Sequence, residues 1–184
     1  MSSTQANQLF QQVYDHARET SFLESTLALL EWDEHTGLPE QAGLYRADQV
    51  TFLSGLTHKR KTDPKLGEWL SELSQSELAE EPNSVLGASI RGWKRDFDRN
   101  IQLPESLVKR TAHAISVGQQ IWASTKGNND FDTFLPYLKE IVSLRREEAT
   151  LLAQNRACRY DSLLDQYEEE ATTAEVDLLF SQLR

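Results

Sequence analysis

Apolar residues recur at every third or fourth position through most of this chain, which is the spacing of amphipathic helices. The first such pattern, from about Gln5 to Leu30, predicts two helices or one bent helix. We expect a break between Glu19 and Ser21, because hydroxyl side chains can cap a new helix and Glu24 follows Ser21 by three residues. The second helix is then predicted to end near His35, since Gly37 and Pro39 terminate helices.

The same pattern continues to the end of the chain. No strand pattern and no repeat of fixed period competes with it. The sequence therefore predicts an all-α fold, an irregular multi-helix bundle of about seven to nine helices, with residues 1–184 as a single helical domain. The expected helices after the first two run from about Glu40 to Lys61, from Pro64 (capped by Asp63) to near Ser74, from an Asn83 cap through Ile101, from Pro104 to Gly127, from Phe131 (capped by Asp130) to about Asn155, from Tyr160 to Tyr167, and onward from a capping box of Thr172 and Glu175.

The net charge of the chain argues against two classes of binding partner. The 184 residues include 29 acidic and 19 basic side chains, a formal charge of −10, so the chain should repel nucleic acid and anionic lipid. The basic run at residues 58–61 falls in the last turn of a predicted helix, where cations are favoured. A second basic stretch, residues 91–99, is interleaved with Asp96 and Asp98. We therefore expect no nucleic-acid partner.

The remaining composition bears on location. The longest strictly apolar run, residues 27–30, is far short of a membrane span. No signal-peptide pattern is present at the N-terminus, and the lone Cys158 has no internal partner. These features predict a cytoplasmic protein without a membrane segment.

Two pairs of side chains are candidates for chemistry. Glu31 and His35 are four residues apart and would share a helical face as a metal or acid–base pair, although a charged helix end with Trp32 as packing anchor is the more common reason for such a cluster and needs no cofactor. Cys158 with His113 as its base would form a nucleophile, although a lone cysteine is more often a small buried residue. No phosphate loop, dinucleotide fingerprint or paired metal-ligand motif occurs. The sequence therefore predicts no catalytic, cofactor-binding or metal-binding residue.

Three blocks of the sequence together resemble the M32 family of metallocarboxypeptidases, which includes carboxypeptidase Taq. The third block, YDSLLDQYEEE, is the most specific, because relatives commonly show Tyr-Asp-x-Leu-Leu-Asp-x-Tyr-Glu followed by Pro-Gly; this chain departs from that pattern with Glu169 and Glu170. The matching residues are Trp32, Asp33, Pro39, Arg46, Ala47 and His58 in the first block, Leu103, Pro104, Trp122, Phe131, Phe134 and Pro136 in the second, and Tyr160, Asp161, Leu163, Leu164, Asp165, Tyr167 and Glu168 in the third.

The resemblance implies a function for the whole enzyme rather than for these residues. Family members remove C-terminal amino acids from peptides with zinc or cobalt, held by an HExxH motif that lies beyond Arg184. The chain would thus correspond to the N-terminal cap and wall region of such an enzyme, carry no catalytic residue, and be inactive alone. The alternative is a free-standing helical interaction or dimerisation module. Because part of the apolar surface would lack its cover, we also expect a homo-oligomer.

Overall fold

The computed structural model describes residues 2–154 and 156–183. In these ranges the chain forms eight α-helices and three short 3-10 helices with no strand, which confirms the predicted all-α bundle. The α-helices are α1 (Ser3–Thr36), α2 (Gly43–Lys61), α3 (Pro64–Ser74), α4 (Val85–Asn100), α5 (Glu105–Thr125), α6 (Phe131–Leu152), α7 (Asp161–Leu164) and α8 (Thr173–Gln182), and the 3-10 helices are η1 (Glu40–Ala42), η2 (Glu77–Ala79) and η3 (Lys126–Asn128).

Helix α1 is one uninterrupted helix of 34 residues, so the predicted break between Glu19 and Ser21 is wrong. The hydroxyl groups of Thr20 and Ser21 form hydrogen bonds within this helix instead of capping a new one. Thr20 Oγ1 donates to the His16 carbonyl at 2.8 Å and Ser21 Oγ donates to the Arg18 carbonyl at 2.7 Å. Thr20 is also buried and accepts a hydrogen bond from Arg60 Nε at 3.1 Å. A hydroxyl that bonds to the preceding turn leaves the helix intact.

Most predicted caps are confirmed. Asp63 accepts from the backbone of Lys65 at 2.9 Å, and Asp130 accepts from the backbone of Thr133 at 3.1 Å. Thr172 and Glu175 form the predicted capping box at the start of α8. These signals lie within four residues of their partners, so the sequence alone specifies them.

Three predicted helix boundaries shift. Ser84, not Asn83, caps α4 by accepting from the backbone of Gly87 at 3.0 Å. Pro104 precedes α5 as its N-cap instead of being its first helical residue. Helix α6 ends at Leu152, earlier than the predicted end at Asn155, a residue that lies outside the described ranges.

The largest apolar cluster joins α1, α3 and α4. Its members Val13, Leu70 and Leu73 are fully buried, and Trp69 and Trp93 pack against it. Gly67 allows α3 and α4 to approach closely, because a Cβ there would stand 2.5 Å from Phe97 Cζ. This end of the molecule is therefore held together by apolar burial.

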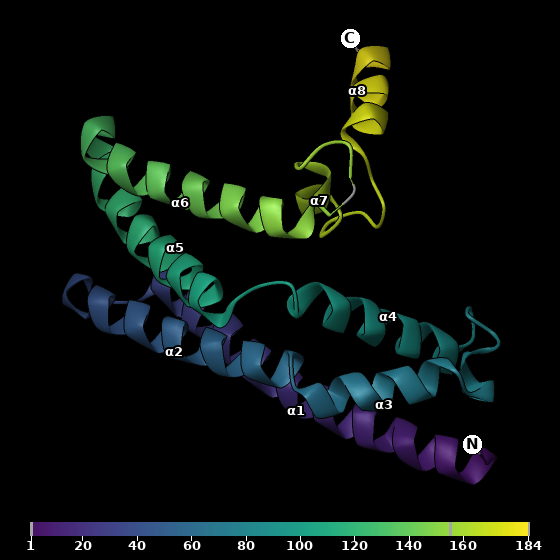
Figure 1. The fold of residues 1–184 in the computed structure, drawn as a ribbon. Helices are drawn as coiled ribbons and strands as arrows, with labels where there is room; N and C mark the ends of the chain where they lie inside the picture. Colours follow the sequence, from purple (N-terminus) through teal and green to yellow (C-terminus); the bar gives the residue numbers. More distant parts are fainter. Residues whose placement is uncertain (1, 155, 184) are drawn as a thin grey trace.

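Helices α5 and α6 form an antiparallel pair, and α5 also packs along α2, which in turn lies beside α1 (Figure 1). A smaller apolar cluster of Leu107, Ala114 and Leu144 lies between α5 and α6. Helix α8 projects away from the rest at the opposite end from the N-terminus (Figure 1). None of its residues is buried. No helix in residues 2–154 or 156–183 combines the length and apolar character that crossing a bilayer requires.

Candidate functional site

A groove of about 800 Å³ is lined by residues of α1, α2, α4, α5, α6 and the segment around α7. Its volume is that of a ligand-sized cleft. Apolar side chains from α1 and α5 contribute much of its lining: Leu27, Ala28, Leu107, Val108, Ala112 and Ile115.

Helix α4 contributes a row of three arginines to this groove. Arg91, Arg95 and Arg99 are four residues apart, so they project from one face of the helix. Arg95 forms ion pairs with Asp165 at 3.0 Å and with Glu169 at 3.4 Å. The row therefore reaches across to the α7 segment, 70 residues further along the chain.

Asp165 is the carboxylate on which these cations converge. It pairs with Arg156 at 3.0 Å as well as with Arg95, and it accepts from the backbone N–H of Glu170 at 3.0 Å. Burial by itself raises the pKa of Asp165, but the Glu170 N–H and the Arg156 guanidinium hold that pKa below its usual value. Asp165 is therefore ionised and fixes α7 against α4.

Asp161, one turn earlier, anchors the following helix. Its Oδ1 accepts from the side chain of Thr173 and, at 2.8 Å, from the Thr173 backbone N–H. These hydrogen bonds, helped by Arg156, lower the pKa of Asp161. The two aspartates of the YDSLLD segment thus have separate roles: Asp165 binds α4, and Asp161 binds the start of α8.

Glu148 supplies a second buried carboxylate from α6. Arg145 donates to it at 2.7 Å and Gln166 donates at 2.9 Å, while Arg99 lies 3.6 Å away. Arg99 donates to the Ser162 carbonyl at 3.1 Å, but its buried Nη2 has no hydrogen-bond partner among the described residues. Burial lowers the pKa of Arg99; the carboxylates of Glu148 and Asp165 oppose this shift, and the neighbouring cations Arg95 and Arg156 add to it. Guanidinium groups are crowded here.

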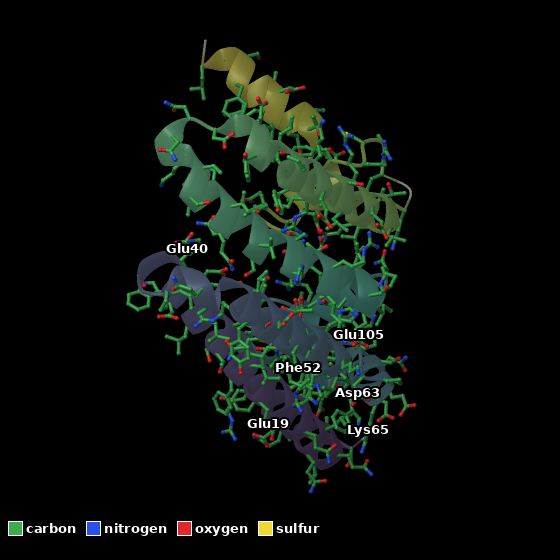
Figure 2. The ribbon with its side chains drawn as sticks, turned by 90° about the vertical axis from the view of Figure 1, so that its left-hand side faces the viewer. Glu19, Glu40, Phe52, Asp63, Lys65 and Glu105 are labelled. Carbon is green, nitrogen blue, oxygen red and sulfur yellow. The ribbon has the colours of Figure 1, made fainter. Side chains whose placement is uncertain are left out.

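The end of α2 closes the other side of the groove. Lys61 pairs with Glu24 of α1 at 2.6 Å and with Asp96 of α4 at 3.2 Å, and although burial opposes its charge these carboxylates raise its pKa. His58 is buried, and this burial lowers its pKa. Lys59 reaches Glu105 at the start of α5, which Figure 2 labels, at 3.6 Å. The basic run at residues 58–61 therefore joins α2 to its neighbours.

The structure does not assemble the two sequence-predicted candidate pairs into sites. Glu31 lines the groove, whereas His35 Nδ1 lies 2.9 Å from Gln119 Nε2. His113 is exposed on α5, and Cys158 is partly buried in the loop before α7, with no hydrogen bond between them among the described residues. Within residues 2–154 and 156–183 no three His, Cys, Asp or Glu side chains are arranged to hold a metal ion. The donors in this part of the chain do not fit a catalytic metal.

The first block of resemblance joins α1 to α2. Arg46 is buried and donates to Asp33 Oδ2 at 2.6 Å and to the Leu30 carbonyl at 2.6 Å. Ala47 beside it is fully buried. Trp32 is 66% exposed, so the prediction that it is a packing anchor is wrong within the part of the chain that the structure describes. The ion pair of Asp33 and Arg46 therefore joins α1 to α2, whereas the indole of Trp32 is exposed.

Glu170, one of the two residues at which the chain departs from the family pattern, has an unusual backbone conformation. Glu170 has a φ of 64°, in the left-handed region that glycine adopts without strain. The family pattern that the YDSLLDQYEEE block resembles has Gly at this position. The Glu170 N–H nevertheless reaches Asp165, so the loop keeps its turn with a residue that disfavours it.

Sequence reasoning missed the residues that organise the groove: Arg95, Arg99, Arg145, Glu148 and Arg156. The spacing of the three α4 arginines was the one available signal. In the sequence, each of these side chains is equally consistent with an ordinary solvated charge on an amphipathic helix. Only the tertiary arrangement distinguishes a charge that lies in the groove from a solvated one.

Comparisons with known proteins agree with the resemblance. The family model described as carboxypeptidase Taq (M32) metallopeptidase matches residues 12–184. The chain is 34% identical to thermostable carboxypeptidase 1 of Thermus thermophilus over 95% of its own length and 36% of that protein. Two solved structures have the same fold: BsuCP, with a TM-score of 0.87 at 25% identity over 96% of this chain and 35% of the other, and metallocarboxypeptidase 1 of Trypanosoma cruzi, with a TM-score of 0.75 at 29% identity over 96% and 35%. The chain therefore spans about a third of the length of these relatives.

Proposed function

Because the family match runs through residues 12–184, this chain belongs to the carboxypeptidase Taq (M32) family of metallopeptidases, and we propose that it forms the N-terminal helical part of a metal-dependent carboxypeptidase. Such an enzyme removes C-terminal amino acids from peptides. The observation that carries the proposal is that 96% of the chain follows the fold of BsuCP with a TM-score of 0.87. Likeness over nearly the whole chain favours a shared structural role.

We propose that the described residues do not catalyse hydrolysis by themselves. Metal-assisted cleavage of a peptide bond needs about three protein ligands and a general base around the ion. The residues that fill the groove are arginines, carboxylates paired to those arginines, and apolar groups. In the proposed enzyme, zinc or cobalt is held by an HExxH segment in the part of the family's length that this chain does not span.

Exposed apolar side chains support a role as one part of a larger assembly. On α1, Phe22 and Leu29 are exposed with Trp32, and on α2 Tyr45 and Phe52 are each more than half exposed. Surfaces of this kind mark contacts with other polypeptide. We propose that the remaining two thirds of the family's length covers part of this surface, and that a second copy of the chain covers part of it in a homo-oligomer.

A chimera tests the main proposal. This chain would replace the matching segment of Thermus thermophilus thermostable carboxypeptidase 1, and release of the C-terminal amino acid from a peptide would be followed with zinc or cobalt. We expect the chimera to release amino acid and this chain alone to release none. Release by the chain alone, or a folded chimera that binds metal without activity, would contradict the proposal.

The alternative function is a non-catalytic interaction or dimerisation module, which the same exposed side chains favour. Sedimentation of the purified chain distinguishes the two. A module should form a discrete oligomer whose mass does not change when the remaining part of the Thermus enzyme is added. A part of a carboxypeptidase should instead form a complex with that polypeptide.

A further inference from the structure

The apolar cluster of α1, α3 and α4 leaves a small cavity at its edge, with a volume of about 230 Å³. Val13 and Leu66 of the cluster line this cavity, together with Ala17 and with Trp93 and Phe97, which pack against the cluster. Protein interiors are close-packed and leave few voids larger than a water molecule, and an apolar cavity of about 150 Å³ is large enough to bind benzene. This cavity therefore has room for one aromatic ring.

The uncharged polar side chains that line the cavity already donate their hydrogen bonds within the chain. His16 Nε2 lies 2.9 Å from the Arg60 carbonyl, which can only accept, so this nitrogen is the donor. Thr20 Oγ1 donates to the His16 carbonyl at 2.8 Å, and Ser21 Oγ donates to the Arg18 carbonyl at 2.7 Å. No donor of these groups is left for a ligand, so a polar ligand must bring its own.

Three charged side chains from α1, α2 and α4 form the rim of the cavity. Lys61 pairs with Glu24 at 2.6 Å and with Asp96 at 3.2 Å, and the three side chains are partly exposed, whereas the apolar lining includes fully buried residues. Among the described residues, Lys61 is the only ion-pair partner of either carboxylate. Two carboxylates thus share one cation, and an added ammonium would give each carboxylate a cation of its own.

We propose that this cavity binds a small aromatic amine, with its ring against Trp93 and Phe97 and its ammonium at the carboxylates of Glu24 and Asp96. The apolar lining selects the ring, and the shared pairing of the two carboxylates selects the positive charge. Glu24, Lys61 and Asp96 also line the 800 Å³ groove, so an amine bound here would change the charged edge of that groove. The inference does not depend on the proposed function.

Ligand-observed NMR titrations with three phenyl probes of matched size test this binding. The probes are 2-phenylethylamine, which is cationic, 2-phenylethanol, which is neutral, and 3-phenylpropanoate, which is anionic. We expect the amine to bind with a Kd of about 1 mM or tighter, a value within reach of a ligand of this size. It should bind about tenfold more tightly than the alcohol, because its hydrogen bonds to the carboxylates are charge-assisted. The anion should bind most weakly.

A cavity-filling substitution assigns the binding to this cavity. Ala17→Leu adds carbon atoms to the cavity wall and should weaken binding of the amine by about tenfold or more. Ala28→Leu is the matched control, because Ala28 lies on the same helix but lines the large groove and not this cavity. The control should change the affinity less than about twofold.

A charge substitution tests the role of the rim. Glu24→Gln removes one of the two carboxylates and should reduce the preference for the amine over the alcohol from about tenfold to about threefold or less. Glu19→Gln is its control, because Glu19, which Figure 2 labels, pairs with Arg60 at 2.9 Å and does not line the cavity. The preference for the amine should persist in that control.

Equal affinity for the three probes, no binding of the amine up to about 10 mM, or an equal loss in Ala17→Leu and Ala28→Leu would overturn the proposal. Thermal melting checks that each variant is folded. If Ala17→Leu is not folded, the comparison of Glu24→Gln with Glu19→Gln decides the proposal, because both side chains are partly exposed. The chimera is assayed without these probes, so failure of amine binding and failure of the proposed function are distinguishable.

Discussion

Two ends of the molecule are stabilised by different interactions, one by buried apolar side chains and the other by ion pairs and hydrogen bonds. Around α1, α3 and α4, fully buried Val13, Leu70 and Leu73 form a continuous apolar cluster. The attachment of α7 and α8 to α4 depends instead on Asp165 and Asp161 and the cations and N–H groups that contact them. Burial of apolar surface is not directional, whereas ion pairs require defined geometry and weaken in salt. The first region should thus set the global stability, and the second should respond to solvent conditions.

The largest expected effect comes from truncating the apolar cluster. Leu70→Ala removes a fully buried side chain, so the free energy of unfolding should fall by about 2–5 kcal/mol. Chemical denaturation followed by circular dichroism measures it. The control is Leu29→Ala at a position that is 67% exposed, where the change should stay within about 0.5 kcal/mol. Equal losses in the two variants would contradict an apolar origin of stability in this region.

A smaller and more local effect should follow from removing the central carboxylate of the second region. Asp165→Asn keeps the shape of the side chain but removes the charge that pairs with Arg95 and Arg156. We expect a loss of about 1–2 kcal/mol and faster amide exchange confined to α7 and the start of α8. The control Asp177→Asn changes an exposed carboxylate on α8 and should alter neither measurement.

The effect of Asp165→Asn should depend on pH and on salt concentration. The pKa values of Asp161 and Asp165 are lowered in the folded chain, so their stabilisation is fully present above the usual aspartate pKa of about 3.9 and is lost as the pH falls through the lowered values. The difference in melting temperature between wild type and Asp165→Asn should therefore be constant above about pH 5 and shrink below about pH 4. Raising the salt concentration should also reduce it. A difference that does not depend on pH or salt would mean that charge is not what Asp165 contributes.

The smallest expected effect is a gain. Glu170 has a left-handed backbone with a φ of 64°, which costs a non-glycine residue about 1–2 kcal/mol. Glu170→Gly should raise the free energy of unfolding by about 0.5–1 kcal/mol after the added flexibility of glycine is counted. Glu168→Gly, two residues earlier, is the control and should be destabilising. A loss at residue 170 would show that the glutamate side chain stabilises the loop more than the strain costs.

The predictions of helix caps are confirmed where the capping side chain has only one possible partner nearby in the sequence. Asp63, Asp130 and Thr172 each contact the chain within three residues, so a prediction from neighbouring residues is sufficient. The hydroxyl of Thr20 has two possible local partners, the start of a new helix or the carbonyl of His16. Its contact with Arg60, 40 residues away, favours the second. No local pattern contains that information.

The groove could not be predicted for the same reason. Its arginine row was visible as a spacing, but its meaning depends on Asp165, which lies 70 residues from Arg95. The resemblance pointed to Asp161 and Asp165 without assigning either a contact. The three-dimensional structure supplies these contacts and so separates one paired cluster of charges from the many solvated charges of an acidic chain.

The unbroken length of α1 links the apolar cluster to the groove. At 1.5 Å per residue its 34 residues extend about 51 Å. Leu9 and Val13 near its beginning belong to the apolar cluster, while Leu27 and Glu31 near its end form a wall of the groove. Because a continuous helix resists bending, a repacking at the first end should tilt the second, and the width of the groove is then sensitive to substitutions that are remote from it.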